Sequence, residues 1–224
     1  SWGFNPGRRS QVLEFKHKPV LFEETIQSLD VRPDGFYIDG TAGGGGHSSA
    51  ILEKLVSGKL LSIDQDPDAV ETVKRRFAGN PCSVVRRANF SEMVKVAEEE
   101  GFSQADGVLL DIGVSSHQLD TPERGFSYHY DAPLDMRMSQ EGVSAADLVN
   151  TLTWQQLAEI ISRYGEDRNA RSIAKGIVAA REKSPVETTL QLAEIIKASV
   201  PAAVRREQGH PARKTFQALR IAVN

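Results

Sequence analysis

Short apolar runs separated by amphipathic runs fill the first half of the chain. The apolar runs at 36–39, 60–64, 83–86 and 107–111 predict strands. The runs at 22–30, 47–57, 67–78 and 91–100 predict helices. Strands that alternate with helices indicate parallel βαβ units, so we expect an α/β fold built on a doubly wound parallel sheet.

The pattern changes after residue 111. Residues 113–145 are rich in Ser, Asp, Gly and Pro and predict loops, whereas 147–204 carry apolar stripes at helical spacing. Thr153 and Thr188 are each followed three residues later by Gln, which is the spacing of a capping box at a helix start. The second half therefore predicts a small helical bundle.

A glycine-rich turn follows the first predicted strand and precedes a predicted helix. Asp39 ends the strand, and four consecutive glycines occupy 43–46. Glycines let backbone N–H groups come close to a ligand, because no Cβ intervenes. The dinucleotide fingerprint G-x-G-x-x-G fails, since its last place holds Ser48 or Ser49. The pattern D-x-x-x-G-x-G fits instead and is typical of S-adenosylmethionine (SAM) sites; the alternatives are a glycine-rich surface loop and a nicotinamide oxidoreductase.

Two more acids stand at the ends of predicted strands. Asp64 lies 21 residues after Gly43, close to the usual spacing of the acid that binds ribose hydroxyls. Asp66, followed by Pro67, has the pattern of a helix N-cap and first helical residue. Asp111 ends the fourth strand. Because the carboxyl ends of parallel strands share one edge of a sheet, we expect Asp111 beside the glycine turn.

Length and composition exclude several classes of protein. The chain has 224 residues and a single cysteine, Cys82, which excludes an internal disulfide framework and a cysteine-rich metal site. We find no apolar run of membrane-spanning length and no signal peptide, and we expect a cytoplasmic protein without a membrane partner. Residues 1–14 predict a flexible leader.

Charge is distributed unevenly along the chain. Residues 168–224 carry 11 Lys/Arg against 4 Asp/Glu, a net +7, whereas 1–167 carry 16 against 26, a net −10. The densest cationic cluster lies at 205–214. Such asymmetry indicates either a polyanion partner or a solvated helical face.

A set of ordered motifs resembles the RsmH (MraW) family of 16S ribosomal RNA cytosine-N4 methyltransferases, which use SAM. The resemblance runs from about Phe15 to Asn224. The motifs are His17-Lys-Pro-Val-Leu21, Asp39-Gly-Thr-Ala-Gly-Gly-Gly-Gly-His47, Asp64-Gln-Asp-Pro67, Leu110-Asp-Ile-Gly-Val-Ser-Ser116, Gln118-Leu-Asp120, Glu123-Arg-Gly-Phe-Ser127, Pro133-Leu-Asp-Met-Arg-Met138, Tyr164-Gly-Glu166 and Lys214-Thr-Phe-Gln-Ala-Leu-Arg-Ile221.

The resemblance implies a Rossmann-like SAM-dependent methyltransferase core at 15–114 and a helical insertion for RNA recognition at 115–212. Residues 213–224 would then return to the core. It also implies a small-subunit ribosomal RNA substrate, with the target in the decoding region; we further expect that the helical bundle could pair as a homodimer. The implied SAM contacts are Gly45, Gly46, His47, Asp64, Phe90, Asp111 and Gln118.

Three of these residues have a second interpretation. Phe90 could cover the adenine ring or serve as a hydrophobic staple. His47 could bind the ligand or be a surface residue at a helix terminus. Gln118 could bind the ligand or be a polar loop residue.

Transfer to cytosine requires help for a poor nucleophile, the exocyclic amine. Asp111 is the catalytic candidate, because a carboxylate can accept the amine N–H and receive developing positive charge. A stacking aromatic would come from the nearest aromatics in sequence, Phe126, Tyr128 and Tyr130. Asp135 and Arg137 could hold the cytosine edge or form a structural salt bridge that ties the insertion to the core.

The family continues beyond this chain with a strand carrying a Ser-Phe-His-Ser motif. The last segment here, 214–224, predicts a helix with no strand after it, so we expect an incomplete sheet. The alternative function is therefore a fragment that binds SAM and RNA without turnover.

Overall fold

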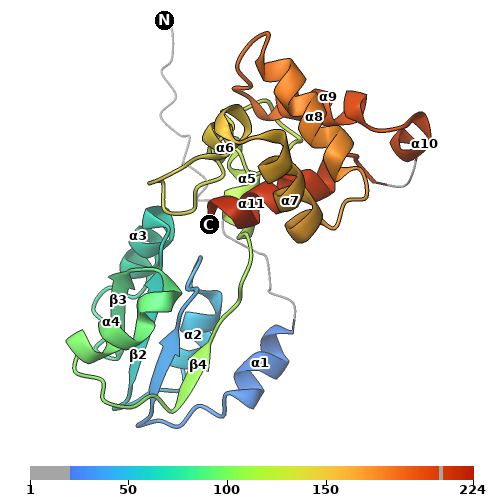
Figure 1. The fold of residues 1–224 in the computed structure, drawn as a ribbon. Helices are drawn as coiled ribbons and strands as arrows, with labels where there is room; N and C mark the ends of the chain where they lie inside the picture. Colours follow the sequence, from blue (N-terminus) through green and yellow to red (C-terminus); the bar gives the residue numbers. More distant parts are fainter. Residues whose placement is uncertain (1–20, 207–208) are drawn as a thin grey trace, which may run out of the picture.

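The structure is a computed structural model that describes residues 21–206 and 209–224. The predicted leader at 1–14 and all but the last residue of the motif at 17–21 lie outside the described residues. Within the described ranges the chain forms a sheet unit and a helical unit (Figure 1). The helical unit lies beyond the edge of the sheet at which the strands end.

The sheet has four parallel strands in the order β3-β2-β1-β4, which confirms the predicted parallel topology. In register, Asp39 is paired with Ser62 on one side and with Leu109 on the other. The strands are β1 (Phe36–Asp39), β2 (Lys59–Asp64), β3 (Ser83–Arg87) and β4 (Gly107–Leu109).

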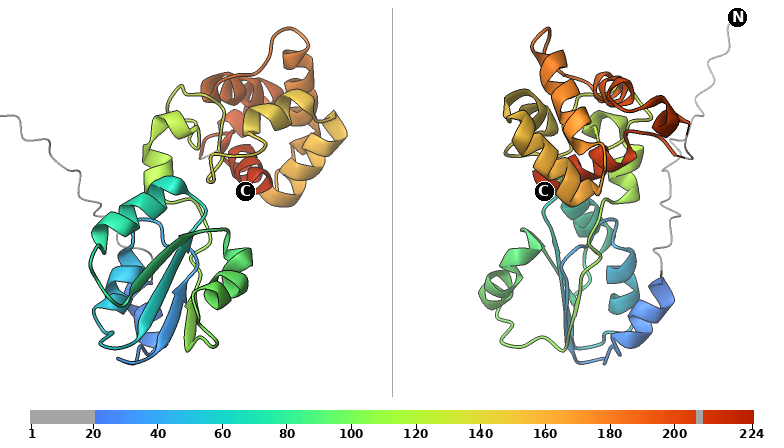
Figure 2. Two further views of the ribbon diagram at one scale, coloured as in Figure 1. Left: turned by 90° about the vertical axis from the view of Figure 1, so that its left-hand side faces the viewer. Right: turned by 45° about the vertical axis from the view of Figure 1, so that its right-hand side comes forward.

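Helices cover both faces of this sheet (Figure 2). Tyr37 and Leu60 pack on one face with Ile51 of α2, while Ile38 and Leu61 pack on the other with α4. This alternation follows from the two-residue period of a strand, and it confirms the doubly wound arrangement. The helices of this unit are α1 (Phe22–Ser28), α2 (Gly46–Leu52), α3 (Pro67–Arg76), the 3-10 helix η1 (Phe90–Glu92) and α4 (Met93–Glu99).

Several predicted boundaries differ from the structure, and the segment 113–145, predicted as loops, contains a short helix at Ser116–Asp120 and a 3-10 turn at Pro122–Arg124. The strand predicted at 107–111 ends at Leu109. The Asp111 N–H donates to the Thr41 hydroxyl at 2.7 Å, so the chain is held by the glycine turn and not by the sheet ladder. The helix predicted at 47–57 ends at Leu52. Asp66 caps α3 as predicted, accepting from the Asp68 N–H with Pro67 at the first helical position.

The helical unit is built around a separate apolar cluster that shares no residue with the two clusters of the sheet. Capping boxes at Thr153 and Thr188 open two of its helices, as predicted. Its elements are α5 (Ser116–Asp120), the 3-10 helix η2 (Pro122–Arg124), α6 (Ala145–Thr151), α7 (Trp154–Gly165), α8 (Ala170–Arg181), α9 (Thr189–Ser199), α10 (Ala202–Arg205) and α11 (Arg213–Val223).

The last helix differs from the prediction that residues 213–224 return to the sheet core. Phe216 and Leu219 of α11 are buried in the apolar cluster of the helical unit, where α11 packs against α7. Gly165 of α7 makes this packing close, because a Cβ there would lie 2.5 Å from the Lys214 carbonyl oxygen. The side chains of α11 are thus used to complete the bundle.

Candidate active site

The glycine turn between β1 and α2 has two residues in the left-handed region. Gly43 has φ of 50° and Gly45 has φ of 78°, a conformation that favours glycine. A Cβ on Gly45 would also lie 3.2 Å from Phe77, so packing against α3 explains that glycine. Gly46 is different, because nothing lies within 4 Å of the position of its missing Cβ. Of the two predicted glycine contacts, Gly46 is therefore the one that leaves room for a ligand.

Asp39 is fully buried beneath this turn. One carboxylate oxygen accepts from the Ser48 hydroxyl at 2.7 Å, and the other accepts from the Thr41 N–H at 3.2 Å. Burial raises the pKa of Asp39, and the hydrogen bonds from Ser48 and Thr41 offset part of that rise. The first acid of the D-x-x-x-G-x-G pattern thus fixes the shape of the turn.

Asp64 holds the turn from the neighbouring strand. Its carboxylate accepts from the Gly43 N–H at 2.8 Å and from the Asp66 N–H at 2.9 Å. Burial raises the pKa of Asp64, while the backbone N–H groups of Asp66 and Gly43 lower it. The structure therefore places the predicted ribose acid directly against the predicted glycine loop.

Phe90 and Asp111 approach the same turn from the ends of β3 and β4. A Cβ on Gly40 would lie 3.3 Å from the Phe90 Cβ and 2.5 Å from Leu110, so only glycine fits there. The Asp111 backbone is bonded to Thr41, and its side chain is exposed. Asp64, Phe90 and Asp111 thus converge from three strands on residues 40–43.

His47 lies in the first turn of α2 and is only 7% exposed. Its ring stacks on Phe22 of α1 with centroids 5.0 Å apart. Its Nε2 is buried and has no hydrogen-bond partner among the residues that the structure describes. The interpretation of His47 as a surface residue is therefore wrong, and an unsatisfied buried nitrogen next to Gly46 is suited to a polar ligand.

Gln118 lies in α5 and faces the end of β2 rather than the glycines. Its amide nitrogen donates to Asp66 at 2.7 Å, and its amide oxygen accepts from the Ser115 N–H at 3.0 Å. Gln118 is 5% exposed, so it is a buried link and not a polar loop residue. Gln118 therefore contacts Asp66, two residues after Asp64, and not Asp64 itself.

Arg124 lies near the site and was not predicted to have a role there. Its guanidinium lies 3.1 Å from the Asp66 carboxylate and 2.8 Å from that of Asp68. It also donates to the carbonyl oxygens of Arg137 and Met138. Arg124 therefore ties the loop at 125–144 to the start of α3. The only feature of the sequence that pointed to Arg124 was its position in the motif Glu123-Arg-Gly-Phe-Ser127.

Asp135 and Arg137 form a two-point salt bridge within that loop, with N···O distances of 2.8 and 2.7 Å. Burial alone would raise the pKa of Asp135, but the hydrogen bonds and charge of Arg137 outweigh it and leave the pKa lowered. The pair matches the salt-bridge interpretation. The link to the sheet unit is made by Arg124 instead.

The three aromatic candidates differ in access. Phe126 is only 1% exposed, so its ring is not accessible to a base. The Tyr128 ring stacks on His210 with centroids 4.6 Å apart, and Tyr130 is 54% exposed. Tyr128 and Tyr130 remain as candidates for stacking.

Residues 21–206 and 209–224 contain no group of three or more His, Cys, Asp or Glu side chains that could hold a metal ion. No helix in those ranges has the length and apolar character needed to cross a bilayer.

Comparison with known proteins gives consistent matches. Residues 14–224 match the profile of the MraW methylase family. Two relatives carry the name ribosomal RNA small subunit methyltransferase H. The one from Lachnospira eligens is 53% identical over 216 residues, which is 95% of this chain and 69% of the relative. The one from Symbiobacterium thermophilum is 54% identical over 216 residues, which is 95% of this chain and 68% of the relative.

Proposed function

This chain belongs to the MraW methylase family, and we propose that it transfers the methyl group of SAM to the N4 amine of a cytosine in small-subunit ribosomal RNA. The target would lie in the decoding region. The observation that carries the proposal is the convergence of Asp64, Phe90 and Asp111 on the glycine turn. The names of the two relatives support the RNA substrate.

The residues present fit SAM on two structural grounds. Gly46 leaves open space at the turn, and His47 offers a buried Nε2 without a described partner. We assign the methionine part to Gly45, Gly46 and His47. We assign the ribose to Asp64, because a carboxylate can accept two hydroxyl donors, and the adenine to Phe90. Gln118 supports this set through Asp66.

Bound SAM supplies a methyl group on a positively charged sulfur. The protein's part is positioning and electrostatics. Asp111 is exposed at the end of β4, where its carboxylate can accept the cytosine N4–H and stabilise the positive charge that develops on nitrogen. The target base must leave its stack to reach this edge, and Tyr128 or Tyr130 would receive it.

The cations of the helical unit support an RNA partner. In residues 21–144, five of the seven arginines pair with carboxylates, namely arginines 32, 86, 87, 124 and 137. In 145–206 and 209–224, the described ion pair is Lys197 with Glu194. Of the cations there without a carboxylate, Arg181, Lys214 and Arg220 donate to backbone carbonyl oxygens. The others are available to phosphates, whose neutralisation releases counterions and favours binding.

The direct test is methyl transfer from labelled SAM to small ribosomal subunits that lack the modification, followed by mass spectrometry of the nucleosides. We expect labelled N4-methylcytidine. Asp111→Asn should reduce transfer even at saturating SAM, and calorimetry measures separately how much SAM affinity the variant loses. SAM and RNA binding without any labelled nucleoside would favour the fragment without turnover, and label on another base would contradict the proposed chemistry.

Location and assembly follow from the proposal. An enzyme that acts on small-subunit RNA is expected in the cytoplasm. A homodimer stays a prediction, and light scattering of the purified chain tests it.

A further inference from the structure

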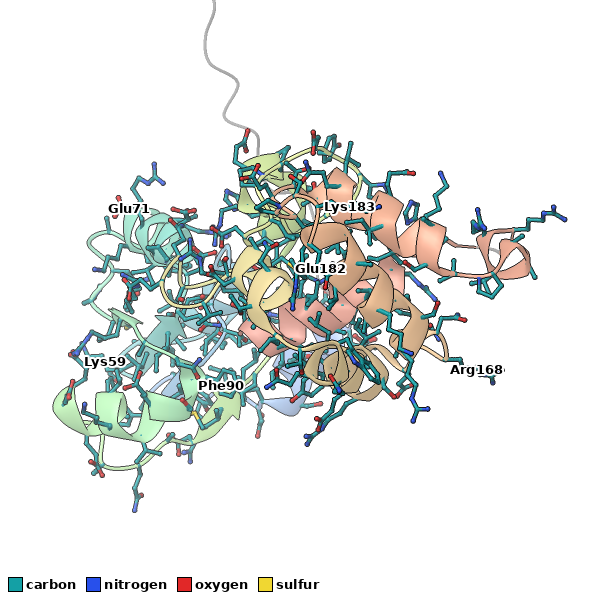
Figure 3. All side chains as sticks on the ribbon, turned by 45° about the horizontal axis from the view of Figure 1, so that its top comes forward. Lys59, Glu71, Phe90, Arg168, Glu182 and Lys183 are labelled. Atoms are coloured by element: carbon teal, nitrogen blue, oxygen red, sulfur yellow. The ribbon has the colours of Figure 1, made fainter. Side chains whose placement is uncertain are left out.

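A groove runs along the surface between α7 and α8, with a volume of about 620 Å³. Trp154, Ala158 and Ser162 of α7 form one wall, at successive turns of the helix. Arg168 and Arg171 contribute to the other wall. Figure 3 places Arg168 on the side of the molecule away from Phe90, so this groove is separate from the candidate active site.

One wall of the groove is cationic. Arg171 and Lys175 lie one turn apart on α8, and Arg168 comes just before that helix; all three side chains are exposed. The Lys175 ammonium lies over the ring of half-buried Trp154, 5.0 Å from its centroid. A base can stack on that ring face once the Lys175 side chain turns to a phosphate. Within the described ranges, these three cations form no ion pair with a carboxylate. The groove therefore combines an aromatic surface with a row of available positive charge.

Two acidic residues also line the groove, and only one of them has a hydrogen-bond partner among the described residues. The Asp167 carboxylate is engaged, accepting from the N–H and the side-chain amide of Asn169. Glu159 is exposed on the α7 wall and faces the groove without a described partner. The negative charge of Glu159 should repel a polyanion. Removing that charge should therefore strengthen the binding of a polyanion to the groove.

We propose that this groove binds a single-stranded segment of ribosomal RNA, with phosphates on Arg168, Arg171 and Lys175 and a base at Trp154. The inference rests on the proposed action on RNA. Single-stranded RNA is the partner that an aromatic ring beside unpaired cations fits, because bases stack on the ring while cations follow the backbone. The site would hold RNA at a distance from the methylated base and so orient the subunit.

The inference is tested by measuring how tightly the chain binds a labelled single-stranded oligouridylate. Fluorescence anisotropy gives the affinity at several salt concentrations. Arg171→Gln and Lys175→Gln should each weaken binding and reduce the slope of log K against log salt by about 0.7. Glu159→Gln should tighten binding. Lys183→Gln is the matched control, because Lys183 is exposed and lies outside the groove. Equal affinity and slope in all four variants would overturn the proposal.

Trp154 supplies a second readout without removing a packed residue. The chain has two tryptophans, so Trp2→Phe leaves Trp154 as the only one. Its emission should be quenched on RNA binding, and unchanged emission during saturable binding contradicts a base at this ring.

Methyl transfer separates the groove proposal from the proposed function. A wild-type chain that methylates small subunits while the groove variants bind like wild type refutes the groove alone, whereas RNA binding through the groove with no labelled RNA refutes the proposed function alone.

Discussion

The backbone N–H of Gly43 donates to the Asp64 carboxylate at 2.8 Å, although the two residues are 21 positions apart. The same carboxylate accepts from the Asp66 N–H, which precedes α3. One side chain thus fixes both the glycine turn and the loop after β2. If Asp64 also binds the ribose, cofactor affinity and the shape of the turn depend on the same group.

Replacing Asp64 should therefore have two effects. Asp64→Ala should weaken SAM binding at least tenfold, about 1.4 kcal/mol, and also lower the thermal midpoint because two backbone N–H groups lose their acceptor. Asp64→Asn retains an acceptor oxygen and should recover more of the thermal midpoint than of the affinity. Calorimetry and thermal unfolding measure the two effects, and full affinity in Asp64→Ala would remove the ribose assignment.

Gly46 and Gly40 provide a pair of alanine substitutions with opposite expected effects on stability. At Gly46 a Cβ meets nothing within 4 Å, so Gly46→Ala should leave the free energy of unfolding unchanged or raise it by up to about 1 kcal/mol. The added methyl group should nevertheless weaken SAM binding, because it fills the space assigned to the ligand. Calorimetry together with urea unfolding checks both effects.

Gly40→Ala is the contrasting variant. Its Cβ would lie 2.5 Å from Leu110 and 3.3 Å from Phe90, so neighbouring residues must move. We expect a loss of about 1–3 kcal/mol in the free energy of unfolding, together with weaker SAM binding. Equal stability of Gly40→Ala and Gly46→Ala in urea unfolding would show that the turn adapts to either methyl group.

Arg124 should be a major contributor to stability. Its side chain is 11% exposed and that of Asp66 is 3% exposed, so Arg124→Ala leaves a buried carboxylate without its cation. We expect a cost of about 3 kcal/mol in urea unfolding. Arg32→Ala is the control, because the Arg32–Asp106 pair is largely exposed and should contribute little. A small effect of Arg124→Ala would mean that Gln118 and the Asp68 N–H suffice to hold Asp66.

Acid should remove the contribution of the Asp135–Arg137 pair. The pKa of Asp135 is lowered in the folded chain, so the folded state binds fewer protons than the unfolded state. The stabilisation is fully present above the unfolded pKa of about 3.9 and is lost as pH falls through the folded pKa. Urea unfolding of wild type and Asp135→Asn over acid pH should show their difference shrinking, and a constant difference would contradict this assignment.

Local patterns predicted the sheet and the capped helices, because strand alternation and capping boxes depend on neighbouring residues. They could not predict where β4 ends, since the hydroxyl of Thr41 decides that from 70 residues away. They also missed Arg124, whose partners come from two distant segments. The burial of Phe126 and the packing of α11 on α7 depend likewise on tertiary contacts that no local pattern specifies.

The separate apolar clusters have a mechanical consequence. Between the two units, the described chain crosses once, through 110–115, and Arg124 and Gln118 supply buried polar contacts across the boundary. Because the units share no apolar cluster, polar contacts such as these fix the orientation of one unit relative to the other. Weakening those contacts is therefore expected to change the orientation of the two units without repacking either apolar cluster.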